Sequence, residues 1–237
     1  MLKVELTENL GGFKILGDYE DLNNLYKSIC NFFDKECKSA KEEIMQNHIF
    51  GFLYDVRHAY QGDREYLLVD NLSDDKREWF GLKKRDVSNN NLYYSFNYLL
   101  TDIIVDMVLI KYFIDYKDTE YNANYHMVNY FYSLILNTLE SSLTKTKFNK
   151  IKKGIINSYI NDKIFIPQWF DNISIDYIKM DKEKREKNLT KLLNMIYNYN
   201  DYQEYFRIKR EVEEFSEREN CPLDNICYED YPEEIIW

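Results

Sequence analysis

The segment over residues 101–116 is apolar on nearly every side if it is wound as a helix. A helix that is hydrophobic all round has no solvent face, so it belongs in the middle of a core. Its apolar side chains are Ile103, Ile104, Val105, Met107, Val108, Leu109, Ile110, Tyr112 and Phe113. The rest of the chain must therefore supply amphipathic elements that surround this segment.

The first hundred residues carry the alternating pattern of half-buried strands. At the start of the chain one face of the pattern is apolar, with Leu2, Val4 and Leu6. Residues 9–12, Asn-Leu-Gly-Gly, supply turn chemistry, and residues 13–16 are expected to return as the second strand of a hairpin. Further short strands are expected where strand-forming residues gather, at residues 66–69 and 92–96.

Helices are expected between these strands. Asp18 stands where an N-cap belongs, because its carboxylate accepts hydrogen bonds from free backbone amides. Apolar residues then recur at helical spacing through Phe33. A second helix is expected over residues 40–60, and Gly62 is placed to end it in a left-handed turn. Residues 73–75, Ser-Asp-Asp, are a further helix-start signal.

Beyond residue 118 the pattern is helical. Amphipathic helices are expected at residues 124–143, 144–160, 181–199 and 202–219, and Pro167 and Pro222 are expected in connections. We therefore predict a helix-dominated α+β fold, in which a small N-terminal antiparallel sheet with helices is followed by a helical C-terminal half. Residues 1–237 are expected to form one continuous domain, mixed over 1–118 and all-helical with an acidic tail over 119–237.

The charge of the chain narrows the classes of partner. A formal net charge of −10 argues against general nucleic-acid binding, which depends on Lys and Arg neutralising phosphates. Residues 145–191 are nevertheless rich in lysine, and the tail from Glu211 onward is acidic. These regions are expected either to attract each other within the fold or to offer a basic face to an acidic partner. The binding candidates on such a face are Lys150, Lys152 and Lys153.

Neither a membrane span nor a secretion signal is recognisable in the sequence. No stretch of about 18 uncharged apolar residues occurs, and the N-terminus lacks a signal-peptide hydrophobic region. We expect a cytoplasmic protein without membrane contacts, whose thiols are reduced. The cysteines, Cys30, Cys37, Cys221 and Cys227, lack the close CxxC spacing of common zinc sites. No cofactor is therefore expected, and a zinc site joining the two cysteine pairs is the alternative.

The densest group of titratable residues lies at the end of the second expected helix, in residues 54–65. Asp55 precedes His58 by one helical turn, so the two side chains are expected to touch, which would orient the ring for acid–base work. Asp63 follows the Gly62 turn and is placed to fold back on this pair. Asp55, His58 and Asp63 are the catalytic candidates of an enzyme, for example a hydrolase, or of a metal-binding protein.

Ion-pair networks resemble active sites in composition, so a structural interpretation stands beside the catalytic one. In it, Arg57 and Arg64 pair with carboxylates and helix-end carbonyls, and His58 caps the helix. The group would then be buried and mutually paired behind Tyr54 and Tyr60. In a functional site it would line an open cleft, with the same two arginines as binding candidates.

Two carboxylates lie one turn apart on the apolar segment, at Asp102 and Asp106. Carboxylates that point into a core must be paired or protonated. With side chains of the second helix they form a candidate metal site of His and carboxylate ligands, namely His48, Asp55, His58, Asp102 and Asp106. The alternative is structural: Asp102 suits the first turn of a helix, and Asp106 pairs with Arg57, Arg64 or a lysine.

Several short blocks of the chain resemble an uncharacterised family of small bacterial proteins. The blocks are Gly17-Asp18-Tyr19, Asp21-Leu22, Leu25-Tyr26, residues 54–59, residues 62–65 and residues 93–97. The resemblance covers residues 11–115, and it departs from the family pattern at Glu20, where an aromatic residue usually stands. It implies a bacterial cytosolic protein and no particular activity.

The sequence favours a protein that acts by binding over an enzyme. It contains no Gly-rich phosphate loop, no GxSxG nucleophile elbow and no HExxH pair. We expect a cytosolic bacterial protein that binds a protein partner or associates with itself. The alternative is an enzyme or metal-binding protein built around Asp55, His58 and Asp63.

Overall fold

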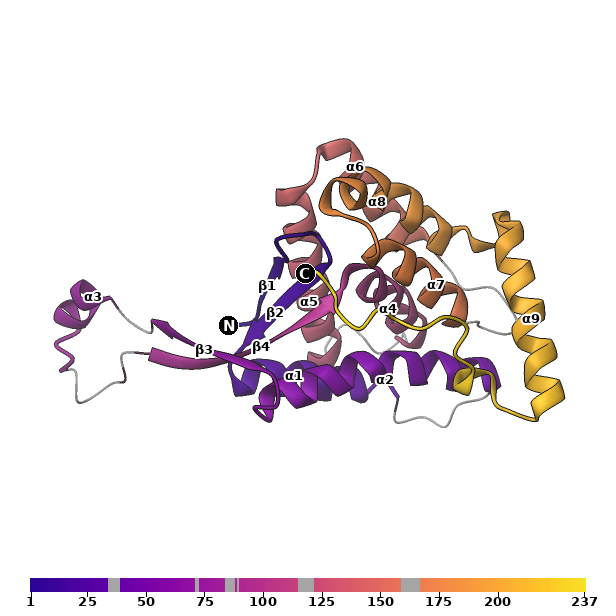
Figure 1. Ribbon diagram of the computed structural model, residues 1–237. Helices are drawn as coiled ribbons and strands as arrows, with labels where there is room; N and C mark the ends of the chain where they lie inside the picture. Colours follow the sequence, from indigo (N-terminus) through magenta and orange to yellow (C-terminus); the bar gives the residue numbers. More distant parts are fainter. Residues whose placement is uncertain (34–38, 71–72, 84–87, 89, 115–121, 159–166) are drawn as a thin grey trace.

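The computed structural model describes residues 1–33, 39–70, 73–83, 88, 90–114, 122–158 and 167–237 (Figure 1). Cys37 and the expected helix ends at residues 115–116 and 159–160 lie outside the described residues. Within the described ranges, none of the helices combines the length and the apolarity that crossing a bilayer requires.

Four antiparallel strands form one sheet in the order β1-β2-β4-β3. Their bounds are β1 (Lys3–Leu6), β2 (Gly12–Gly17), β3 (Glu65–Asp70) and β4 (Asn90–Leu99). Strand β4 pairs with β2 through its C-terminal half and with β3 through its N-terminal half, so Ser95 lies opposite both Leu16 and Glu65. The antiparallel sheet expected near the N-terminus is thereby confirmed.

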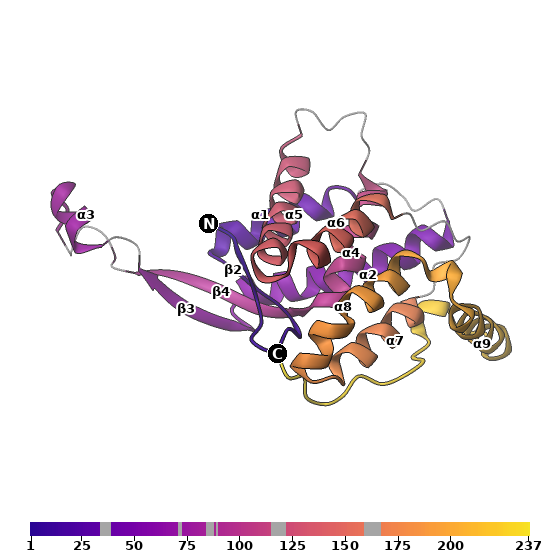
Figure 2. The same cartoon turned by 90° about the horizontal axis from the view of Figure 1, so that it is seen from above.

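One part of the sheet projects from the body of the molecule. Strand β3, the short helix α3 (Asp74–Trp79) and the N-terminal half of β4 extend to one side, with α3 at the far end (Figures 1 and 2). We call this part the arm. The N-terminal start signal of α3 is confirmed, because the Ser73 side chain accepts a hydrogen bond from the Lys76 amide.

Helices make up most of the remaining structure, which confirms a helix-dominated α+β fold. Before β3 and after β4 lie α1 (Tyr19–Cys30), α2 (Ala40–Tyr60) and α4 (Leu100–Phe113). The later helices are α5 (Ala123–Ser142), α6 (Lys145–Asn157), α7 (Pro167–Ile178), α8 (Lys182–Tyr197) and α9 (Gln203–Glu219), with 3-10 turns η2 (Tyr199–Asp201) and η3 (Leu223–Asn225).

Helix α7 corrects the sequence-based prediction. Pro167 was expected in a connection, but it is the first residue of α7. Proline is well tolerated in the first turn of a helix, because the amide that it lacks has no intrahelical partner there. The helix is largely buried, with Trp169 and Tyr177 fully enclosed, so its sequence shows little of the amphipathic contrast that marks a surface helix.

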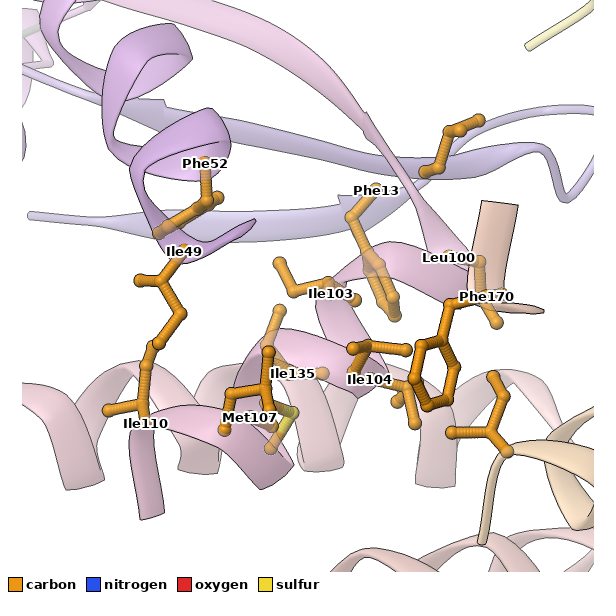
Figure 3. Close-up of a cluster of buried hydrophobic side chains, with 14 of the residues drawn as sticks. Phe13, Ile49, Phe52, Leu100, Ile103, Ile104, Met107, Ile110, Ile135 and Phe170 are labelled. Carbon is orange, nitrogen blue, oxygen red and sulfur yellow. The ribbon is translucent and has the colours of Figure 1, made fainter. Parts of the chain in front are cut away.

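Helix α4 occupies the centre of the core, as its uniform apolarity predicts. Figure 3 shows its side chains surrounded by residues from β2, α2, α5 and α7, among them Phe13, Phe52, Ile135 and Phe170. Phe52 stacks on Phe131 of α5 with ring centroids 5.6 Å apart. The fold is therefore assembled around α4, with the sheet on one side and helices on the others.

The ends of the first two helices follow their sequence signals. Asp18 caps α1, and its carboxylate accepts a hydrogen bond from the Asp21 amide while the Asp21 carboxylate accepts one from the Asp18 amide. Gly62, at φ +89°, ends α2. The amides of Gly62 and Asp63 donate to the carbonyls of Ala59 and His58, which is the double hydrogen bond of a Schellman motif.

The C-terminal tail, residues 220–237, returns past α7 to the β1–β2 turn (Figures 1 and 2). Its anchor is Arg185 of α8, whose side chain is 1% exposed. The guanidinium donates to four carbonyl oxygens, those of Asn9, Tyr177, Ile178 and Ile236. The side-chain amide of Asn9 also donates to the carbonyl of Trp237 at 2.8 Å. One buried cation thus ties three parts of the chain together.

Candidate functional site

The charged group at the end of α2 forms two separate pairs. His58 Nδ1 lies 2.9 Å from Asp63 Oδ2. Asp55 accepts hydrogen bonds from Arg64, at 2.7 Å from Nη2 and 3.3 Å from Nε. The expected contact between Asp55 and His58 is therefore replaced by pairing of each residue with the segment that follows the Gly62 turn. Helix geometry alone did not indicate this exchange, because it depends on how the chain folds back.

The two pairs lie at the surface, where His58 and Asp55 are half-buried and their partners Asp63 and Arg64 are exposed. The Asp63 side chain is 57% exposed and Tyr54 is half exposed, with its ring 4.1 Å from the His58 ring. The Arg57 guanidinium lies 5.7 Å from the centre of the Tyr54 ring. The residues are paired, as the structural interpretation expects, but they are not enclosed behind Tyr54. This arrangement fastens the start of β3 to the end of α2.

Replacing His58 with alanine is expected to lower the free energy of unfolding by about 1 kcal/mol or less, because solvent-exposed ion pairs contribute little. Urea unfolding at pH 7 measures the change. Asp63→Asn is the matched control, since it removes the same pair from the other side and should cost a similar amount. A loss of roughly 3 kcal/mol or more would instead require a buried network.

The two carboxylates of α4 take part in a polar network, in which Asp106 is buried and Asp102 is half-buried. The Tyr98 hydroxyl donates to Asp106 Oδ2 at 2.8 Å, and His48 Nε2 lies 3.7 Å from Asp106 Oδ1. The expected pairing of Asp106 with an arginine or a lysine is therefore corrected. Asp102, in the first turn as expected, accepts a hydrogen bond from Ser174 of α7 at 2.5 Å and one from Thr101 at 3.3 Å.

Burial favours the neutral forms of Asp102, Asp106 and His48. It raises the pKa of Asp102 to about 7 and that of Asp106 well above its usual range. It lowers the pKa of His48 to about 4. A protonated carboxyl beside a neutral imidazole carries no net charge, which is how such groups are accommodated in a core without a counter-ion.

A metal site is not assembled from the candidate ligands. Within the described ranges, no group of three or more His, Cys, Asp or Glu side chains is placed to hold a metal ion. His48 and Asp106 do meet, whereas Asp55 and His58 are engaged in the surface pairs. Cys30, Cys221 and Cys227 are free thiols. The partners Tyr98 and Ser174 were not singled out from the sequence, because nothing in its pattern brings β4 and α7 to α4.

The candidate lysines divide between two surfaces. Lys150 and Lys153 line a groove of about 1050 Å3 between α6 and α8, together with Lys187 and Lys191 of α8. Lys152 points elsewhere, with its ammonium 5.7 Å from the centre of the Phe148 ring. The charge run on α6 indicated the first two lysines, but their counterparts on α8 were missed because the pairing of the helices is not encoded locally.

The expected attraction between the basic region and the acidic tail is partly realised. Lys179 pairs with Glu229 of the tail. Lys147 pairs instead with Glu186 of α8 at 3.4 Å. The groove lysines take no part in these pairs.

The arm exposes large apolar side chains that the sequence did not single out. Tyr66 and Leu68 of β3 are 70% and 64% exposed, and Trp79 of α3 is 81% exposed. Tyr66 lies opposite Tyr94 and Leu68 opposite Leu92. Since side chains alternate along a strand, these four residues share one face of the β3–β4 ribbon. Tyr94 packs against the core, whereas Tyr66, Leu68 and Leu92 form an exposed apolar surface on this face.

Comparison with known protein families identifies a match that spans nearly the whole chain. A family model described as a domain of unknown function, DUF6904, matches residues 2–237. The match extends past the region of resemblance at residues 11–115 and runs through all of the later helices. No curated protein and no solved structure matches the chain.

Proposed function

The chain belongs to the DUF6904 family, and we propose that it acts by self-association, with the arm of one copy pairing with the arm of a second. The observation that carries this proposal is the apolar face of the β3–β4 ribbon. Tyr66, Leu68 and Leu92 are all exposed on it, beside an open strand edge.

One edge of the sheet is covered and the other is open. The β1 edge is covered by α5, whose Thr138 hydroxyl donates to the Val4 carbonyl at 2.8 Å. Strand β3 is the other edge, and within the described residues it pairs only with β4. An uncovered edge strand offers backbone groups to another strand, and proteins usually block such edges. Leaving this one open, with apolar neighbours, supports a role in association.

A binding partner would stabilise the ribbon more than it would stabilise a strand inside the body of the molecule. A two-stranded ribbon is marginally stable by itself in water and needs a packed apolar face. Exposed apolar side chains that gather in one patch are typical of interaction sites. Trp79 and Phe80 at the tip of the arm extend the same character beyond the strands.

A second copy fits this edge because β3 is complementary to itself. If Leu67 lies opposite Leu67 of the second copy in an antiparallel pair, Tyr66 faces Leu68 of that copy. In the same register Arg64, which also pairs with Asp55 of its own copy, faces Asp70 of the second copy, so opposite charges meet at both ends. A two-fold arrangement repeats each contact, as isologous interfaces do, and cross-strand apolar and opposite-charge pairs are stabilising. The result would be one sheet continuous across two copies.

Leu68→Lys tests the proposal. The wild-type protein is expected to sediment as a dimer at micromolar concentration. The variant is expected to raise the dimer dissociation constant by at least about a hundredfold, since burying two like charges near the two-fold axis costs several kcal/mol. Sedimentation equilibrium measures both.

Phe206→Lys is the matched control, because Phe206 is a half-exposed apolar residue on α9, outside the arm. It should leave the dissociation constant unchanged. A wild-type protein that stays monomeric at about 100 µM, or a control that dissociates as readily as Leu68→Lys, would refute association through the arm.

The alternative built around Asp55, His58 and Asp63 gains no support from the position of the groove. The groove is lined by residues of α6, α8 and η2, and none of these three side chains contributes to it. Self-association is therefore the function that the geometry favours.

A further inference from the structure

The groove between α6 and α8 has a closely packed floor. Ile151 and Leu193 are buried beneath it, and the Tyr197 ring lies against Gly154. A Cβ atom at Gly154 would fall 2.0 Å from Tyr197 Cε2, so only glycine admits this approach. The Tyr197 hydroxyl donates to the Ile151 carbonyl at 3.4 Å, and burial raises its pKa above the usual range, so the phenol stays neutral.

The two helices run in the same general direction along the groove. Lys147 near the start of α6 contacts Glu186 near the start of α8. Gly154 near the end of α6 contacts Tyr197, the last residue of α8. Residues in matching positions of the two helices therefore face each other, which gives the groove two distinct ends.

One end of the groove is basic. Lys150 and Lys153 stand three residues apart on α6, and Lys187 and Lys191 stand four apart on α8, so each pair lies on one face of its helix. Within the described residues, none of these four lysines forms an ion pair, whereas Lys147, Lys179 and Lys184 each pair with a carboxylate. Four like charges that converge without carboxylates favour the binding of an anion.

The other end is polar. It is lined by Asn157, Asn198 and Asn200, together with the carboxylate of Asp201 in η2. The C-termini of α6 and α8 also lie at this end, and helix C-termini carry partial negative charge. A second anionic group is therefore disfavoured here, whereas hydroxyl and amide groups find donors and acceptors in the asparagine side chains.

We propose that this groove binds a small organic phosphate, with two or more phosphates at the lysine end and a neutral polar body, such as a nucleoside, at the asparagine end. Lysine ammonium groups bind phosphate as point charges. The volume of about 1050 Å3 is close to the upper range of small-molecule sites. An acidic polypeptide fits less well, because its charges would continue past Asp201.

Isothermal titration with ATP, inorganic tripolyphosphate and hexaglutamate tests the inference, in 0.15 M salt without divalent cations. ATP is expected to bind more tightly than tripolyphosphate, and hexaglutamate more weakly than both. Lys150→Glu/Lys187→Glu should weaken ATP binding at least tenfold. The double variant Lys152→Glu/Lys182→Glu changes the net charge equally at exposed positions outside the groove, so it should stay within twofold of wild type.

Several results would overturn the inference. No heat of binding for ATP at 5 mM would do so, as would equal losses in the two double variants. An affinity for ATP no greater than that for tripolyphosphate would show that the asparagine end does not bind a neutral body. Tighter binding of hexaglutamate would assign the groove to an acidic protein segment instead. None of the three probes depends on the arm, so Leu68→Lys should bind ATP like wild type whether or not it forms dimers.

Discussion

Replacing Arg185 with methionine is expected to lower the free energy of unfolding by about 4 kcal/mol, because the loss of one partner from a buried charged network leaves its other members unsatisfied. Four carbonyl oxygens lose a donor together, those of Asn9, Tyr177, Ile178 and Ile236. Two of them belong to the last turn of α7, where carbonyls lack intrahelical partners, although the Tyr177 carbonyl also accepts from the Met180 amide at 3.1 Å. Methionine fills much of the volume but donates no hydrogen bond.

Denaturant unfolding of Arg185→Met against Lys184→Met provides the comparison. Lys184 is exposed and pairs with Asp181 within the same turn, so its replacement should cost less than about 1 kcal/mol. Arg185→Lys keeps the charge but loses the planar fork that reaches several carbonyls at once, and it should recover only part of the loss. Equal stability of Arg185→Met and wild type would show that the tail is held by its apolar contacts alone.

Replacing Asp102 with asparagine is expected to remove a pH dependence of stability. The pKa of Asp102 is raised to about 7 in the folded protein, above the unfolded value near 3.9. The folded state therefore binds a proton that the unfolded state releases between pH 4 and 7. The stability that Asp102 contributes is fully present below pH 4 and is lost as pH rises through about 7. Asparagine resembles the protonated acid and still accepts from Ser174.

The measurable quantity is the stability difference between Asp102→Asn and wild type. It should shift in favour of the variant by about 3 kcal/mol between pH 5 and pH 8, as integration over that window gives. Asp181→Asn is the control, because the Lys184 amide lowers the pKa of that carboxyl, so its contribution is lost only as pH falls below this window and its stability difference should stay constant between pH 5 and pH 8. A difference for Asp102→Asn that stays constant with pH would mean that this carboxyl is ionised in the folded protein.

Local signals in the sequence predicted much of the fold. The all-round apolarity of residues 101–116 placed α4 at the centre, and Asp18 and Gly62 marked helix ends through hydrogen bonds between near neighbours. The alternation of Leu2, Val4 and Leu6 indicated β1. Each of these signals acts over one or two turns of chain, and for that reason each can be read without knowing the rest of the structure.

The candidate sites depended on contacts that no local pattern encodes. Helical spacing predicts a contact between Asp55 and His58, which are one turn apart. The chain folds back after Gly62, however, so that Asp55 binds Arg64 instead. Half of the groove was visible as a charge run on α6, and the other half lies about 40 residues later on α8. In the sequence nothing distinguishes Arg185 from the exposed lysines of the same helix. Its burial depends on the position of the C-terminal tail.

The return of the tail has a consequence for how the protein is made. The Trp237 carbonyl accepts from Asn9, at a separation of 228 positions, and the Ile236 carbonyl shares Arg185 with the Asn9 carbonyl. Contacts this distant in sequence close late in folding. During synthesis the β1–β2 hairpin emerges from the ribosome before residues 236 and 237. Its turn then has its own hydrogen bonds between Thr7 and Gly12 but lacks those that Asn9 makes to the tail until these two residues are made. We therefore expect nascent chains stalled before residue 236 to be cleaved by protease at the hairpin turn, and released chains to resist.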